Sequence, residues 1–193
     1  KPAFQGHEHP VPVNSCSLGM PAINKALQSI KTSFSDSDQE LIQAYRPRLL
    51  LRDNGHDGAV AILFLFGKTD QKVNPRFREW LRGIDLTGWQ IRLAKTAELR
   101  FAKSVVALKG GNPNVYIKTS IGEITAEPTV FTQVNRSMSE ILIRTALDHI
   151  PDGGSILDLY GGYGAFGLEY AIRGGNAEVI DSAGDSIAAG QSF

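Results

Sequence analysis

The stretch that most constrains this chain is Ser155–Gly167, where a short apolar run leads into closely spaced glycines. The run Ser155–Tyr160 is bounded by glycine pairs and contains one acidic residue, as is typical of a buried parallel strand. An apolar segment of helical length follows and ends at Gly174. This order predicts a site for a nucleotide-type cofactor, because backbone can approach a ligand where there is no Cβ and a helix N-terminus offers N–H groups.

The glycines alone do not identify which cofactor binds. Residues Gly162–Gly167 match the dinucleotide pattern G-x-G-x-x-G, and Asp181 ends the next predicted strand, where a carboxylate commonly accepts hydrogen bonds from ribose hydroxyls. Asp158, just ahead of the turn, would repel a pyrophosphate but attract the sulfonium and α-ammonium of S-adenosylmethionine. We therefore favour S-adenosylmethionine over a nicotinamide dinucleotide, with a purely structural glycine turn as the third interpretation.

The first two thirds of the chain show a different pattern. Its predicted elements are a helix of about 14 residues from Pro21, strands Arg48–Arg52 and Ala59–Phe66, a helix from Asn74-Pro75, strands Trp89–Leu93 and Leu99–Leu108, and a hairpin over Tyr116–Ala126. Strands in hairpins with a few helices predict an antiparallel α+β domain over residues 1–128.

After residue 128 the pattern becomes that of a doubly wound α/β unit. A helix capped by Asn135 precedes the Ser155–Tyr160 strand, the glycine turn, a second helix and the strand Ala177–Asp181. Residues 129–193 are thus the predicted start of a Rossmann-like domain, and the overall fold class is α/β. Two parallel strands leave both faces and an edge exposed, so we expect either a truncated chain or a covering partner, such as a second copy.

Net charge is zero over the 193 residues but is unevenly distributed. Residues Arg46–Lys109 hold 13 Lys and Arg against 6 Asp and Glu, a balance of +7. Such a region favours binding of a polyanion such as RNA. The alternative is that the uneven charge distribution arose by chance on a solvent-exposed surface.

Composition also indicates a compartment. The longest apolar run, Ala59–Phe66, has eight residues and is too short to span a bilayer, and no secretory signal opens the chain. The single cysteine, Cys16, excludes an internal disulfide and fits a reducing cytoplasm. We therefore expect a cytoplasmic protein without a membrane partner.

Two segments carry a resemblance to a known family. Phe131–Asn135 reads F-T-Q-V-N, and Asp158–Phe166 reads D-L-Y-G-G-Y-G-A-F. In this order they resemble the S-adenosylmethionine-dependent RNA uracil-C5 methyltransferases that act on tRNA and 23S rRNA. In that family F-x-Q-V-N introduces the catalytic domain and D-L-[FY]-x-G-x-G-x-F forms the cofactor loop.

The resemblance implies roles for individual residues. It places Gln133, Tyr160 and Asp181 on the cofactor, beside Asp158 and the turn glycines Gly162 and Gly164. Ala165 departs from the pattern, since the family usually has a polar residue there.

Cys16 stands where iron–sulfur members of the family have their last cluster cysteine. A cluster needs four ligands, so we expect one only in a longer protein and favour an unligated cysteine in this chain.

The same resemblance implies an RNA methyltransferase that modifies C5 of a uridine. That reaction needs a cysteine thiolate to add at C6 and a base to remove the C5 proton. No cysteine follows Cys16, so this chain contains no predicted catalytic residue and is expected to be inactive alone. The alternatives are a non-catalytic RNA- or protein-binding module that kept the cofactor turn, and part of an NAD-dependent oxidoreductase.

Overall fold

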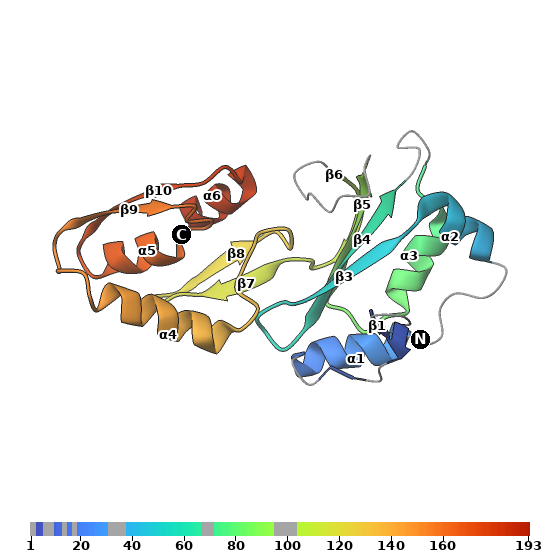
Figure 1. Ribbon diagram of the computed structural model, residues 1–193. Coiled ribbons are helices and arrows are strands. Elements are labelled where there is room, and N and C mark those ends of the chain that lie inside the picture. Colours follow the sequence, from blue (N-terminus) through green and yellow to red (C-terminus); the bar gives the residue numbers. More distant parts are fainter. Residues whose placement is uncertain are drawn as a thin grey trace. The chain divides into compact units, whose positions relative to one another are not determined.

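A computed structural model describes residues 3–5, 10–12, 15–16, 19–30, 38–66, 72–94 and 104–193. The chain divides into two compact units, Lys1–Asn114 and Val115–Phe193, which are described separately below (Figure 1). The division falls earlier than the predicted boundary after residue 128, so the hairpin of residues 115–126 groups with the second unit.

The described part of the first unit contains a sheet in the order β3-β4-β5-β6, three helices and a small β1–β2 hairpin. Their bounds are β1 (Ala3–Gln5), β2 (Pro10–Pro12), α1 (Pro21–Ser29), α2 (Gln39–Tyr45), β3 (Arg48–Asp53), β4 (Ala59–Phe66), α3 (Pro75–Arg82), β5 (Gly88–Ala94) and β6 (Ser104–Gly111).

Strand β4 is the centre of this unit, and all eight of its residues are buried. On one face Ala61, Leu63 and Leu65 join a core cluster with residues of α1 and α3. On the other face Ile62, Phe64 and Phe66 form a second cluster with Ala94 of β5. The unbroken apolar run that the sequence shows here therefore belongs to a strand covered on both sides, rather than to one with a solvated face.

The α/β class is confirmed, but one pairing differs from the prediction. Strands β3 and β4 are antiparallel, as predicted, whereas β4 and β5 are parallel, so the sheet is mixed. The reason is α3, which lies between β4 and β5 in the chain and forms a crossover connection, and such a connection joins parallel strands.

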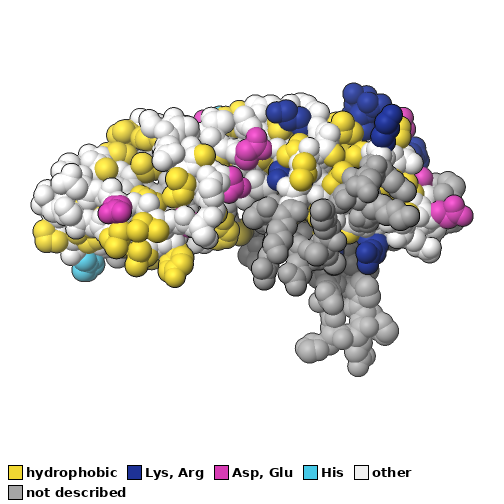
Figure 2. Space-filling view, turned by 90° about the horizontal axis from the view of Figure 1, so that it is seen from above, with side chains coloured by type: hydrophobic (Ala, Val, Ile, Leu, Met, Phe, Trp, Pro, Cys, Tyr) yellow, Lys and Arg dark blue, Asp and Glu magenta, His cyan; other side chains and the backbone are white. Residues whose placement is uncertain are grey.

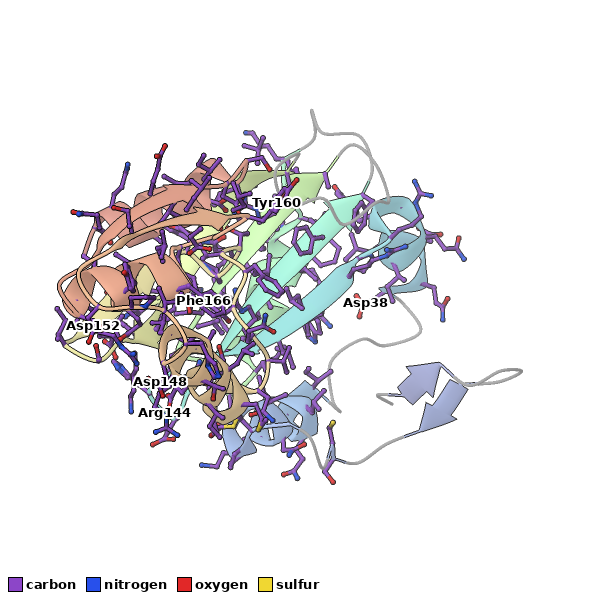
Figure 3. All side chains as sticks on the ribbon, turned by 60° about the vertical axis from the view of Figure 1, so that its left-hand side comes forward. Asp38, Arg144, Asp148, Asp152, Tyr160 and Phe166 are labelled. Carbon is purple, nitrogen blue, oxygen red and sulfur yellow. The ribbon has the colours of Figure 1, made fainter. Side chains whose placement is uncertain are left out.

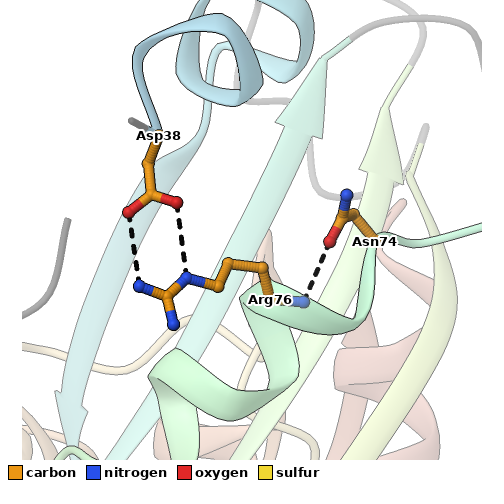
Figure 4. Close-up of polar contacts among 3 residues, drawn as sticks. All are labelled: Asp38, Asn74 and Arg76. Atoms are coloured by element: carbon orange, nitrogen blue, oxygen red, sulfur yellow. Dashed lines mark hydrogen bonds and ion pairs between the residues drawn. The ribbon is translucent and has the colours of Figure 1, made fainter. Parts of the chain in front are cut away.

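Helix α2 was not predicted. It is only seven residues long, and no residue of it is fully buried, so its hydrophobic pattern is weak. Asp38 precedes it without capping it, and instead accepts hydrogen bonds from the Arg76 guanidinium at 3.3 Å and 3.4 Å (Figure 4). An ion pair with α3 thus fixes the start of α2, and such a long-range contact is invisible in local sequence.

The second unit has the predicted order of elements. These are β7 (Val115–Lys118), β8 (Glu123–Ala126), α4 (Arg136–Leu147), β9 (Ser155–Leu159), α5 (Ala165–Ile172), β10 (Asn176–Ile180) and α6 (Gly184–Gln191). Strands β7 and β8 form the predicted hairpin, and β9 and β10 are parallel, as in a βαβ unit. The hairpin turn is held to α5, because Ser120 N–H donates to Glu169 Oε1 at 2.8 Å.

One face of the β9–β10 sheet is exposed and carries three apolar side chains. Leu157, Leu159 and Ile180 alternate with half-buried residues along their strands and are 54%, 56% and 47% exposed, and the exposed Glu178 lies on the same face. Figure 2 shows hydrophobic side chains gathered on the visible side of the second unit, at the left of the view. The covering partner expected from the sequence stays a prediction.

Within the parts of the chain that the structure describes, no helix is both long enough and apolar enough to cross a membrane.

The cap of α3 provides a test of the first unit. The Asn74 side chain accepts a hydrogen bond from Arg76 N–H at 2.9 Å, and Pro75 occupies the first helical position (Figure 4). We expect Asn74→Ala to lower the free energy of unfolding by about 1 kcal/mol, because an N-terminal N–H loses its acceptor. Both tryptophans, Trp80 and Trp89, lie in the first unit, so their fluorescence during urea unfolding reports on it. Asn74→Ser, which keeps an acceptor, should retain most of the stability, and equal losses in both variants would contradict the capping role.

Candidate functional site

The turn after β9 is built from left-handed backbone. Gly162 and Gly164 have φ values of 60° and 86°, and Gly164 N–H donates to Gly161 C=O at 2.8 Å. Glycine adopts such angles without steric cost. Tyr160 has a φ of 58° and is not glycine, and strained residues of this kind cluster at ligand sites.

Two further glycines allow the turn to pack closely on β10. A Cβ at Gly161 would lie 2.7 Å from Val179 Cγ1, and a Cβ at Gly167 would lie 2.5 Å from Val179 Cγ2. Neither position can hold a side chain without displacing Val179. A Cβ at Gly162, by contrast, would meet no atom within 4 Å. The turn is thus tight against the sheet at its ends and open at Gly162.

Asp158 lies against the turn, where the sequence placed it. Its Oδ2 accepts a hydrogen bond from Gly167 N–H at 3.0 Å, which ties the start of α5 to β9. A carboxylate has about four acceptor positions and this bond uses one, so the group can also bind a cationic ligand.

Asp181 makes contacts that the sequence did not reveal. Its Oδ2 accepts from Gly162 N–H at 2.8 Å and its Oδ1 from Ala183 N–H at 2.7 Å. These hydrogen bonds, led by that of Ala183, lower the pKa of the Asp181 carboxyl below its ordinary value. A turn N–H that could bind a phosphate therefore already binds a carboxylate, so a pyrophosphate would have to displace it and would face Asp158 as well.

Tyr160 follows β9 directly and is 89% exposed (Figure 3). Its ring lies at the carboxyl end of the strand, where open α/β sheets bind ligands. An exposed aromatic ring held in strained backbone fits a ligand contact better than it fits packing.

Gln133 lies in a different place. It lines a hollow of about 70 Å³, together with Lys118 of β7, Arg136 and Glu140 of α4, and Tyr163 of the turn. Asp158, Gly162, Gly164 and Asp181 meet around the turn itself, and Tyr163 is the residue that links the turn to the hollow. Sequence reasoning missed Lys118, Arg136 and Tyr163, and only the position of Tyr163 between two turn glycines could have indicated one of them.

Cys16 takes part in a polar contact through its backbone. Its N–H donates to Asn24 Oδ1 at 2.7 Å, and Asn24 Nδ2 donates to Cys16 C=O at 3.0 Å. Across the described ranges no three His, Cys, Asp or Glu side chains are grouped so that they could hold a metal ion. The cluster predicted for a longer protein therefore stays a prediction.

Comparison with known proteins found a likeness in structure but none in sequence. No family model matches the chain, and no curated protein matches it. A crystal structure of Pyrococcus abyssi tRNA (uracil-54, C5)-methyltransferase in complex with S-adenosyl-L-homocysteine aligns with a TM-score of 0.68 at 17% identity, over 95% of this chain and 46% of that protein. The chain thus shares its fold with less than half of an RNA uracil-C5 methyltransferase, which confirms the fold that the sequence resemblance implied.

The hydrogen bonds that the Asp181 carboxylate accepts predict how the stability of the fold depends on pH. Because its pKa is lowered in the folded state, the carboxylate stabilises the fold above its unfolded pKa of about 3.9, and this contribution is lost as pH falls through the lower folded pKa. We expect Asp181→Asn to be less stable than the unsubstituted chain at pH 7 and to approach it in stability toward pH 3. Urea unfolding across this pH range measures the difference in free energy of unfolding between the two proteins. A difference that does not vary with pH would contradict a stabilising role for the Asp181 carboxylate.

Proposed function

We propose that this chain forms the methyl-donor site and the RNA-facing part of an S-adenosylmethionine-dependent methyltransferase that modifies C5 of a uridine in tRNA or rRNA. The observation that carries this proposal is the pair of carboxylates, Asp158 and Asp181, on the two strand ends that hold the glycine turn. The fold shared with a uracil-C5 methyltransferase supports it.

The residues at the turn fit the cofactor. Asp158 offers negative charge to the sulfonium and α-ammonium groups, and Asp181 retains acceptor positions for ribose hydroxyls. Tyr160 offers an exposed ring, and the open space over Gly162 leaves room for the ligand. When bound, S-adenosylmethionine supplies the methyl group; the turn binds and orients it.

The nucleotide alternative fits less well. A pyrophosphate at the turn would meet two carboxylates, one of which already accepts the Gly162 N–H. This repulsion opposes the attraction that the helix N-terminus offers to an anion. An NAD-dependent activity is therefore the weaker candidate.

The methyl transfer needs a cysteine nucleophile, and no cysteine follows Cys16 in this chain. A thiolate must add to uracil C6 before C5 can accept the methyl group, and a base must then take the C5 proton. The proposal therefore assigns cofactor and RNA binding to this chain, and we expect no methylation by it alone. A module that binds RNA without catalysis would share the binding behaviour.

Calorimetric titration tests the cofactor. We expect S-adenosylmethionine and S-adenosylhomocysteine to bind and NAD to give no heat. Asp158→Asn should weaken S-adenosylmethionine by about tenfold, because a charge-assisted contact to the ligand is lost. The matched control is Asp152→Asn, in an exposed carboxylate of the loop before β9 (Figure 3), which should bind as before. Binding of NAD without the sulfur compounds would overturn the proposal.

The RNA-binding part of the proposal rests on the charge of the first unit. On α3, Arg78 and Arg82 are both exposed and lie four residues apart, on one side of the helix. Figure 2 shows Lys and Arg side chains on the visible side of this unit, at the right of the view. Guanidinium groups bind phosphates well, so this surface fits an RNA backbone.

Salt dependence separates phosphate contacts from other binding. We expect the affinity for an unmodified tRNA transcript to fall steeply as salt is added. The double variant Arg78→Gln/Arg82→Gln should lower the slope of log K against log salt by about 1 for each phosphate contact removed. Arg144→Gln, an exposed position on α4 of the second unit, is the control and should leave the slope unchanged. Affinity that does not vary with salt would count against an RNA interface here.

A further inference from the structure

The segment that follows β8 is bonded to the start of α6. The Thr129 hydroxyl donates a hydrogen bond to Asp185 Oδ2 at 3.1 Å, although the two residues lie 56 positions apart in the chain. Asp185 stands in the first turn of α6, where its negative charge also suits the positive end of the helix dipole. The contact therefore joins the connection between β10 and α6 to a distant segment of the second unit.

The surroundings of Thr129 hold its hydroxyl in place. Val130 N–H donates to Glu127 C=O at 3.0 Å, which closes a turn with Pro128 as its second residue. Proline suits this position because its φ is already set. Pro128 and Val130, on either side of Thr129, are both buried, and β8 itself packs against α6 (Figure 1). The hydroxyl therefore reaches Asp185 with little further loss of conformational freedom.

The connection that receives this hydrogen bond also carries Asp181. Asp185 follows Asp181 by only four positions. At one end Asp181 accepts hydrogen bonds from Gly162 N–H and Ala183 N–H, and at the other end Asp185 accepts the Thr129 hydroxyl. A connection this short has few conformations once both of its ends are fixed. Thr129 therefore acts on the glycine turn through the backbone between Asp185 and Asp181.

We propose that Thr129 and Asp185 are positioning residues for the cofactor turn, and that their hydrogen bond fixes the connection from which Asp181 contacts Gly162. The effect on a ligand rests on the proposed function, which assigns ribose hydroxyls to Asp181. Loss of the hydrogen bond would act through Asp181, so it would weaken any ligand that carries this ribose, whatever group lies at the other end of that ligand.

Amide exchange measured by NMR without ligand tests the positioning directly. Thr129→Val replaces the hydroxyl by a methyl group of similar size and removes the donor. We expect the Gly162 and Ala183 amides, which donate to Asp181, to exchange about threefold faster in this variant. The Gly167 amide donates to Asp158 instead, so its exchange should not change. Faster exchange at all three amides would show a general loss of stability and would overturn the positioning role.

Two further variants serve as controls. Thr129→Ser keeps the hydroxyl and should restore slow exchange at Gly162 and Ala183. Thr125→Val makes the same change at an exposed position of β8 and should leave both amides as they are. Failure of the serine variant to restore slow exchange, or an equal effect of Thr125→Val, would overturn the role of the Thr129 hydroxyl.

Calorimetry then measures the consequence for the ligand. S-adenosylhomocysteine and 5′-methylthioadenosine share the ribose, and only the first has an amino-acid end. We expect Thr129→Val to weaken both by about threefold, since both depend on Asp181. Against an Asp185→Ala background Thr129→Val should have no further effect, because the hydrogen bond is already lost.

The outcomes separate this inference from the function on which it rests. Unchanged exchange at Gly162 and Ala183 in Thr129→Val would overturn the positioning role, whether or not the ligands bind. Faster exchange at these two amides, with no binding of either ligand to the unsubstituted chain, would support the positioning of Asp181 and overturn the proposed function.

Discussion

The hydrogen bond from Gly162 N–H to Asp181 is the contact on which the site depends. It joins the middle of the turn to the end of β10, while Asp158 joins the end of the turn to β9. The turn is therefore held by both strands before any ligand arrives. Preorganisation of this kind reduces the ordering cost of binding, because the loop conformation is already set. It also fixes the electrostatic sign of the site, since two carboxylates are placed where a phosphate-binding turn would leave N–H groups open.

The charge of the turn bears on which ligand it could hold. Asp158 and Asp181 both contact the turn, and the cations Lys118 and Arg136 line the separate hollow that Tyr163 also borders. A sulfonium would be attracted by the two carboxylates, whereas a pyrophosphate would be repelled by them. The proposal of a methyl donor over a dinucleotide therefore rests on where these charges lie, because the glycine pattern is shared by sites for both.

Local signals in the sequence predicted much of this fold. Asn74-Pro75 and Asn135 begin helices where capping rules place them, and the β7–β8 hairpin follows its glycine turn. What local sequence could not supply was pairing at a distance. The parallel β4–β5 pair depends on a crossover through α3, and α2 depends on the contact of Asp38 with Arg76. At the site, Asp158 was predicted from its position just ahead of the glycine turn and Asp181 from its position after the next strand, but the hydrogen bond of Asp181 to the turn was not predicted.

The exposed apolar side chains of β9 and β10 affect the stability of the two strands that hold the turn. Leu159 and Ile180 are register partners at the carboxyl end of their strands, next to the turn, and about half of each side chain is exposed. Burying such side chains is worth roughly 1.5–3 kcal/mol each, so leaving them in water is costly for a sheet of two strands. Asp158 alternates with Leu157 and Leu159 along β9, so its side chain points to the opposite face of the sheet, where it accepts the Gly167 N–H of α5. A partner that covered the three apolar side chains would therefore stabilise the two strands that hold the turn, while leaving the surroundings of Asp158 unchanged.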